Sequence, residues 1–329
     1  MFPNHLFDPI RPEMEQVELL LRRTATKVDE PLRSMVSPLL GGGKQLRPAL
    51  VILTGRLFKA PPAPFHKLAA AVDMLHTATL IHDDLIDCSP VRRGQATLHS
   101  VWPAGAAVLA GDYLLGEATA QIAELESPRI AKAFAGILRT MCAGEIRRWI
   151  ACQRGYDASR VGGADDWREE YYRDIQAKTA SLFAATMEMA AVLANAGEQQ
   201  VDMLRRYGQG LGMTFQIVDD ILDFAGDAQN LGKPVGSDLR RSLPTLPLLC
   251  YLEMKGISGP VAAVLNGEGA EADIEAALAA VRASGAIAAA LDEARSYATE
   301  SQEALASFGD CRSIQILRAL AASVIDREV

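Results

Sequence analysis

Cysteine is scarce in this 329-residue sequence, and its five cysteines are scattered without any C-x-x-C pair. This odd, dispersed set excludes a disulfide framework and a zinc knuckle, and it favours a reducing, cytoplasmic location. Aromatic residues make up only 6% of the chain. No apolar run reaches about 18 residues, so we expect neither a transmembrane helix nor an export signal.

A surplus of basic charge is also missing, since 41 acidic and 33 basic residues give a net charge of -8 at pH 7. Nucleic-acid-binding proteins need a basic footprint, so we expect no nucleic acid partner. What the chain does have is 49% hydrophobic residues, enough for a large core. No long Ser/Gly/Pro-rich linker divides it, and we therefore expect one domain over residues 1–329.

Four long segments repeat apolar residues at spacings of three and four, which is typical of buried helices: residues 64–87, 127–153, 177–197 and 198–224. They are rich in Ala, Leu and Met, which favour helix. The period-2 alternation of strands is scarce. The sequence therefore predicts an all-α fold, a single large helical bundle around a central cavity.

Two of these helices end in the same acidic pattern, D-D-x-x-D. HDDLID holds Asp83, Asp84 and Asp87, and VDDILD holds Asp219, Asp220 and Asp223. At about 100° per residue, each triplet gathers three carboxylates on one side of its helix. Such clusters repel themselves unless a cation is present, and hard oxygen ligands suit Mg²⁺ shared with substrate phosphates. One triplet alone could equally be a solvated helix end, but two in apolar helices favour a metal site.

Basic residues that could bind phosphate surround the triplets: Lys44, Arg47, Arg92, Arg93 and Lys233. Any one of them could simply be an exposed loop residue. Lys178 is more informative, because an unpaired lysine in an apolar helix is costly and should point at an anion. His76 lies seven residues before Asp83 and so nearly on its face, whereas His82 points elsewhere and is expected to be structural.

Taken in order, the segments GGKQLRP, HTATLIHDDLIDCSPVRRGQ, VLAGDYLL, MCAGE, AKTA, FQIVDDILDF, GKPVGSDL and TLP resemble the trans-type polyprenyl diphosphate synthases. The resemblance runs from about residue 40 to 250. It implies a homodimeric, all-α prenyltransferase that condenses an allylic diphosphate head-to-tail with isopentenyl diphosphate. It also implies Mg²⁺ as cofactor, as three ions with the allylic diphosphate bound.

The resemblance also implies a role for individual residues. Asp83, Asp87 and Asp219 would hold Mg²⁺, supported by Asp84 and Asp223 and less directly by Asp220. The allylic diphosphate would be bound by Arg92, Lys178 and Lys233, and isopentenyl diphosphate by Lys44, Arg47, His76 and Arg93. Thr179 and Gln216 would face the allylic cation. The released diphosphate would take the final proton.

The chain departs from this family at two positions. Leu243 stands where a lysine is common, and Arg148 stands where a glutamine is common. Arg240 or Arg241 are the candidates to compensate for Leu243. Both departures bear on substrate affinity and allylic preference, while the two metal motifs are intact.

Product length depends on the residues before Asp83, because one helical turn of about 5.4 Å spans roughly one isoprene unit. Thr79 and Ala78 are small, where the family associates bulky aromatics with short products. Leu75 and Val72 would line deeper levels. We therefore predict a product of C20 or longer, with C30 to C50 favoured.

Four alternatives remain open at this stage. They are a short-chain C15 or C20 synthase, a terpene cyclase or head-to-head condensing enzyme, a non-catalytic partner subunit of a heteromeric synthase, and a metal-binding helical scaffold. The second diphosphate site formed by Lys44, Arg47 and Arg93 disfavours a cyclase, and the complete Asp motifs disfavour a non-catalytic subunit. The sequence predicts no stable insertion into a membrane.

Overall fold

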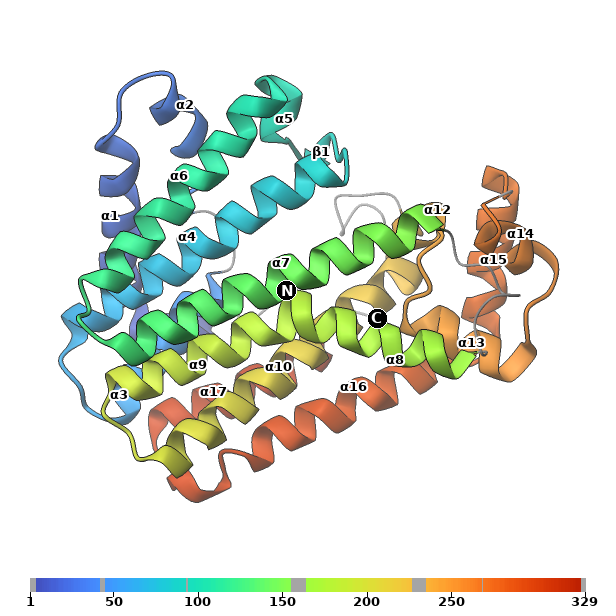
Figure 1. Ribbon diagram of the computed structural model, residues 1–329. Helices are drawn as coiled ribbons and strands as arrows, with labels where there is room; N and C mark the ends of the chain where they lie inside the picture. Colours follow the sequence, from blue (N-terminus) through green and yellow to red (C-terminus); the bar gives the residue numbers. More distant parts are fainter. Residues whose placement is uncertain are drawn as a thin grey trace.

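The computed structural model describes residues 4–41, 45–92, 94–154, 164–226, 235–267 and 269–326. Helices dominate it, as predicted, and the described strands form only one two-stranded antiparallel hairpin in which Val91 pairs with Ala96 (Figure 1). The elements of the first half are η1 (Asn4–Ile10), α1 (Arg11–Thr26), α2 (Leu32–Val36), α3 (Leu46–Leu57), α4 (Pro62–Ile86), β1 (Val91–Arg92), β2 (Gln95–Ala96), α5 (Leu98–Val101), α6 (Ala104–Ala123) and α7 (Pro128–Arg154).

The second half continues the helical bundle. Its elements are α8 (Ala164–Ile175), η2 (Gln176–Ala180), α9 (Ser181–Leu193), α10 (Glu198–Ala225), α12 (Ser237–Arg240), α13 (Leu246–Lys255), α14 (Gly259–Leu265), α15 (Glu271–Ala283), α16 (Ala286–Glu303), η3 (Ala306–Phe308) and α17 (Arg312–Ile325). Buried apolar side chains form one cluster that reaches from Ile10 to Val324. No single described helix is long and apolar enough to cross a membrane. The bent pair Glu271–Ala283 and Ala286–Phe308, taken together, has the required length and apolar composition.

The four helices predicted from apolar spacing are present as α4, α7, α9 and α10. Helix α4 has proline in its first turn, where the missing N–H costs nothing, and it ends just before Asp87. Helix α10 begins after Gly197, whose backbone N–H donates a hydrogen bond to Gln200 Oε1 at 3.1 Å. Both helices point their acidic ends toward the same end of the molecule, near α12 (Figure 1).

One short segment differs from the prediction of a regular helix. Residues Gln176–Ala180, just before α9, form a turn of π-helix. A π-turn inserts an extra residue into the helix and is frequent at functional sites. Here it contains Lys178 and Thr179, two residues expected to contact substrate.

Glycines let two neighbouring helices approach this π-turn closely. A Cβ on Gly144 of α7 would lie 2.7 Å from the Ala177 Cβ, and a Cβ on Gly212 of α10 would lie 2.5 Å from the Ala180 Cα. Neither position has room for a larger side chain. The π-turn is therefore held between α7 and α10, and residues one turn beyond each glycine come next to it.

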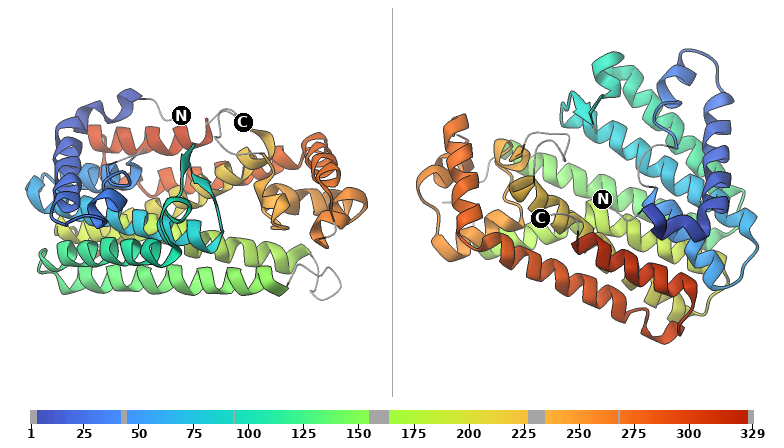
Figure 2. Two further views of the ribbon diagram at one scale, coloured as in Figure 1. Left: turned by 90° about the horizontal axis from the view of Figure 1, so that it is seen from above. Right: turned by 180° about the vertical axis from the view of Figure 1, so that it is seen from behind.

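Helices α6 and α7 lie together on one side of the molecule (Figure 2). Viewed from above, α17 lies on the opposite side, and α4, α9 and α10 lie between (Figure 2, left). The central helices therefore carry the acidic ends, and α6 and α7 form an outer layer.

Candidate active site

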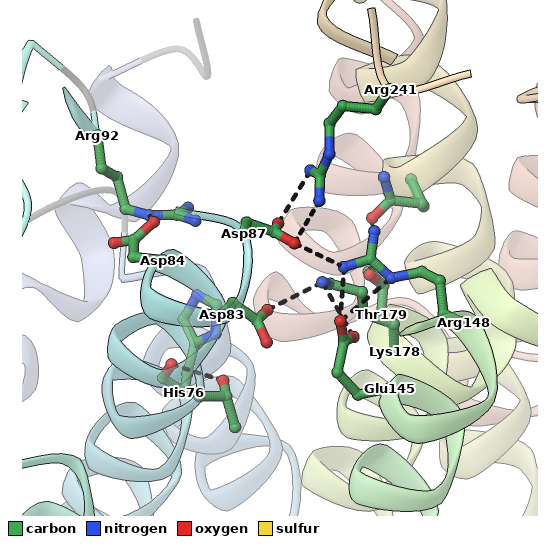
Figure 3. Close-up of polar contacts among 12 residues, drawn as sticks. His76, Asp83, Asp84, Asp87, Arg92, Glu145, Arg148, Lys178, Thr179 and Arg241 are labelled. Atoms are coloured by element: carbon green, nitrogen blue, oxygen red, sulfur yellow. Dashed lines mark hydrogen bonds and ion pairs between the residues drawn. The ribbon is translucent and has the colours of Figure 1, made fainter. Parts of the chain in front are cut away.

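Asp83 and Asp87 at the end of α4 face basic side chains from three other elements (Figure 3). Lys178 Nζ lies 3.0 Å from Asp83 Oδ2. Asp87 is bound by Arg148 of α7, whose Nη2 lies 3.4 Å from Oδ1, and by both terminal nitrogens of Arg241. In the structure these cations balance the negative charge of carboxylates that would otherwise repel one another.

Glu145 is the third carboxylate of this cluster. It accepts hydrogen bonds from Arg148 Nη2 at 2.6 Å and from Lys178 Nζ at 3.3 Å. Burial would raise the pKa of Glu145, but Lys178 and Arg148 outweigh it and hold the pKa below its usual value. In the same way, burial would raise the pKa of Asp87, and Arg241 and Arg148 hold it low. Both groups are therefore anionic near neutral pH.

The spacing of the first triplet predicted three carboxylates on one side of the helix, but the structure does not show three converging carboxylates there. Asp84 is buried and turns away from Asp83 and Asp87 to accept a 2.7 Å hydrogen bond from Arg92 Nε (Figure 3). Burial raises the pKa of Asp84, and Arg92 opposes that shift. Because position i+1 is rotated by about 100°, a partner on that flank is enough to draw the side chain aside.

The second triplet also divides. Asp219 is partly exposed, whereas Asp220 and Asp223 are buried and already hydrogen-bonded. Asp220 accepts from the Tyr171 hydroxyl at 2.7 Å and from Gln216 Nε2 at 2.9 Å. Burial and the nearby Asp238 raise the pKa of Asp220 well above its usual value. Asp219 is thus the most exposed member of this triplet.

Asp223 has a local structural task. Its carboxylate accepts from Ser237 Oγ at 2.7 Å and from the Asp238 backbone N–H at 3.0 Å, at the start of α12. The preceding Gly236 adopts φ of 80°, a conformation that favours glycine. The second acidic motif therefore anchors the turn after which Arg241 reaches Asp87 of the first.

Thr179 and Gln216 meet across the contact between the π-turn and α10. The Thr179 hydroxyl lies 2.7 Å from Gln216 Oε1, while Gln216 Nε2 donates to Asp220. Gln216 lies one turn after Gly212, whose missing side chain permits this approach. The amide is therefore held from both ends, with its oxygen toward the π-turn.

The remaining predicted residues lie as follows. Arg47 at the start of α3 stacks on Phe183, its Cζ 4.2 Å from the ring centroid, and His76 lies on α4 below Asp83 (Figure 3). Lys44, Arg93 and Lys233 lie outside the described residues. His82 packs against Gly111, and its Nε2 lies 3.2 Å from the Val108 carbonyl oxygen. These contacts agree with a structural histidine.

Sequence reasoning did not single out Glu145 or Tyr171. Glu145 had a detectable signal, because it lies three residues before Arg148 on the inner face of an amphipathic helix. Tyr171 had none, since its pairing with Asp220 joins α8 to α10 across 49 residues of sequence.

The donor set suits a hard divalent cation. Asp83 and Asp87 carry carboxylate oxygens of the kind that Mg²⁺ prefers, and Mg²⁺ fills the rest of its shell with water and phosphate oxygens. Within the described part of the chain, no three His, Cys, Asp or Glu side chains already converge on one point. Asp83 and Asp87 are instead in ion pairs with Lys178, Arg148 and Arg241.

Known proteins are similar to this chain in sequence and in fold. A sequence model of the family described as polyprenyl synthetase matches residues 28–281. The chain belongs to the polyprenyl synthetase family. Members of this family are prenyltransferases, which confirms the enzyme class predicted from the sequence. The helical structure and the fold of the matching solved structures confirm the predicted all-α fold.

Individual relatives cover nearly the whole chain. The nonaprenyl diphosphate synthase of Mycobacterium tuberculosis is 32% identical over 97% of this chain and 93% of its own. The heptaprenyl diphosphate synthase component 2 of Geobacillus stearothermophilus is 36% identical over 84% of this chain and 83% of its own. Among solved structures, a polyprenyl synthase from Caulobacter crescentus, complexed with calcium and isoprenyl diphosphate, has a TM-score of 0.90 and 34% identity. That match covers 99% of this chain and 98% of that one.

Proposed function

We propose that this protein condenses an allylic diphosphate head-to-tail with isopentenyl diphosphate, in a magnesium-dependent reaction that yields a trans-polyprenyl diphosphate of C30 to C50. The observation that carries the proposal is the pairing of Asp83 with Lys178, beside the bonded pair of Thr179 and Gln216. Carboxylates for metal, a cation for diphosphate and neutral oxygens for a carbocation thus lie on adjoining elements.

The chemistry requires a leaving group whose charge is neutralised as the C–O bond of the allylic diphosphate ionises. Mg²⁺, which Asp83, Asp87 and Asp219 would hold, would supply much of that neutralisation. Lys178 supplies part of the rest, since its ammonium is also held by Glu145 of α7. A group held in place before the reaction costs no reorganisation when charge develops.

The allylic cation needs oxygen atoms nearby that do not attack it. The Thr179 hydroxyl donates to Gln216, and the amide of Gln216 is fixed by Asp220. Both groups are therefore oriented and weakly nucleophilic. They stabilise positive charge on carbon until the double bond of isopentenyl diphosphate attacks, and the released diphosphate takes the proton.

We propose the length of the product from the residues of α4 that precede Asp83. Ala78 is 2% exposed, and Leu75 and Val72 are completely buried. Thr79 is half-buried and satisfies its hydroxyl on the His76 carbonyl oxygen at 2.8 Å, which leaves its small methyl as the obstacle at that level. The names of the relatives from M. tuberculosis and G. stearothermophilus denote products of nine and seven prenyl units, which supports a long product here.

The assembly proposed is a homodimer formed through α6 and α7. These outer helices carry large apolar side chains that face solvent, namely Leu109 (68% exposed), Ile146 (59%) and Trp149 (52%). Burial of such side chains against a second copy would remove apolar surface from water. The name of the Geobacillus relative, a "component 2", makes a heteromeric assembly the competing outcome.

A single assay tests the activity. Purified protein is incubated with labelled isopentenyl diphosphate, Mg²⁺ and C10, C15 or C20 allylic starters, and the products are separated by chain length. We expect elongation beyond C20 that EDTA abolishes. Asp83→Ala should lower turnover by about a thousandfold or more. Absence of turnover with every starter, in a folded protein, would refute the proposal.

A further inference from the structure

Two arginines that the reaction outlined above does not use converge on Asp87. Arg148 reaches it from α7, and Arg241 reaches it from the residue after α12, with Nη1 at 3.0 Å from Oδ2 (Figure 3). We propose that Arg148 and Arg241 are diphosphate-binding residues, which form ion pairs with Asp87 until a divalent ion binds that carboxylate. This proposal deepens the proposed function and rests on it.

The fold aims Arg241, and not its neighbour, at the site. Arg240 Nε lies 3.3 Å from Glu271 Oε2 on α15, so that side chain is directed away from Asp87. Asp223 fixes the start of α12 through Ser237 and Asp238. Since α12 is short and held at its start, the next residue is presented toward the end of α4.

Arg241 is the cation through which this segment reaches the cluster. Leu243, two residues later, is 8% exposed and brings no charge. It lines a cavity of about 140 Å³ together with Arg148, Lys178 and Gln216. The leucine thus forms an apolar part of a wall that also carries Asp174 and Asp238, and Arg241 is the described cation of this segment that reaches Asp87.

The balance of charge indicates what happens when metal binds. Among the described residues of the cluster, Lys178, Arg148 and Arg241 face Asp83, Asp87 and Glu145. Metal binding by Asp83 and Asp87 takes these two carboxylates from the three cations. Glu145 remains bonded to Lys178 and Arg148, Asp174 lies near Arg148, and Asp238 lies near Arg241. The cations released from Asp83 and Asp87 can then bind an anion, and a guanidinium fork fits phosphate oxygens as well as it fits a carboxylate.

Metal and diphosphate should therefore bind cooperatively. Without diphosphate, an ion must displace Arg241 from both oxygens of Asp87 and break the 3.4 Å contact of Arg148 with it, while Arg148 keeps its hydrogen bond to Glu145. With diphosphate present, the arginines transfer to its oxygens. Because such coupling is reciprocal, each ligand should raise the affinity for the other by the same factor.

The test measures binding without any prenyl substrate. Free Mn²⁺ is followed by electron paramagnetic resonance, with and without inorganic diphosphate, and diphosphate binding is followed by calorimetry at saturating Mn²⁺. The proteins are the wild type, Arg241→Leu, Arg148→Gln and the control Arg240→Leu. Arg241→Lys retains the charge, and circular dichroism checks that each variant is folded.

We expect Arg241→Leu to bind Mn²⁺ alone more tightly than the wild type and to bind diphosphate about tenfold more weakly, so that the coupling factor falls. Arg148→Gln should change in the same direction, Arg241→Lys should lie between, and Arg240→Leu should match the wild type. If both Arg241→Leu and Arg148→Gln, while folded, bind diphosphate as tightly as the wild type, the proposal is wrong. An enzyme that shows this coupling but elongates no starter would refute only the proposed function.

Discussion

Lys178 bridges two helices through two carboxylates, since its Nζ lies 3.0 Å from Asp83 Oδ2 and 3.3 Å from Glu145 Oε2. Asp83 belongs to α4 and Glu145 to α7, and the π-turn between α8 and α9 carries the lysine. The costly lysine of an otherwise apolar segment thus points at anions, as its sequence context predicted.

Replacement of Lys178 should affect the chemical step. Lys178→Ala leaves Asp83 and Glu145 facing each other without their shared cation and removes a group that neutralises the leaving diphosphate. We expect kcat to fall by about 10²- to 10³-fold. Steady-state kinetics with an allylic starter measures this, and Lys132→Ala, on the exposed face of α7, is the matched control. A kcat for Lys178→Ala equal to that of the wild type would contradict this role.

The side chain at position 79 should limit product length. Thr79→Phe places a ring on the Asp83 face one turn below the site, and we expect the product distribution to shift to C20 or shorter. Thr79→Ser should leave it unchanged. Chromatography of dephosphorylated products decides this, and unchanged lengths for Thr79→Phe would place the floor of the tail elsewhere.

Ala78 should respond differently, because it is buried in the core. Ala78→Phe overpacks α4 against its neighbours, and we expect it to lower the free energy of unfolding by about 1–3 kcal/mol. A change in product length by that variant is therefore interpretable only alongside a melting curve.

The outer face of α6 and α7 should control assembly. Leu109→Glu combined with Trp149→Glu puts charge on the apolar surface, and we expect a monomer by light scattering where the wild type is a dimer. Leu19→Glu, at a leucine of α1 that is 46% exposed, is the control and should remain dimeric. A wild-type protein that is monomeric alone and active only with a second, different chain would replace the homodimer with a heteromer.

The buried hydrogen bond between Tyr171 and Asp220 should contribute to stability. Tyr171→Phe leaves a buried carboxyl oxygen without its donor, and we expect the free energy of unfolding to fall by about 1–3 kcal/mol. Urea denaturation measures it. Tyr251→Phe, whose hydroxyl makes no hydrogen bond within the described structure, should cost much less. Equal losses for both variants would indicate that the Asp220 bond has no special weight.

Asp174 should make stability depend on pH. Burial, with the charge of Glu170, raises the pKa of Asp174 from 3.8 to about 6. A raised folded-state pKa means that the folded protein holds the proton longer, so the penalty is absent below pH 3.8, grows up to about pH 6 and is complete above it.

Asp174→Asn should remove this penalty. We expect it to stabilise the protein by about 1–2 kcal/mol at pH 8, after allowance for partial exposure, and to change little at pH 4. Denaturation at the two pH values measures the difference, with the exposed Asp326→Asn as control. A gain of the same size at both pH values would show that the effect is not electrostatic.

The sequence by itself determined the helices and the chemistry of their ends. Apolar spacing within about twenty residues marks α4, α7, α9 and α10, because helix formation depends on neighbours three and four positions apart. The same local spacing places Asp83 and Asp87 on one face of α4. Ordered motifs along the chain were sufficient to identify the family.

Only the tertiary structure decided which side chains meet. Asp84 and Asp220 turn from the cluster because Arg92 and Tyr171 hold them, and Arg241 rather than Arg240 faces Asp87 because of how α12 is anchored. The contact of Gly144 and Gly212 with the π-turn likewise joins segments far apart in the chain. Side-chain direction depends on partners supplied by other elements, and a periodic pattern within one helix carries no information about them.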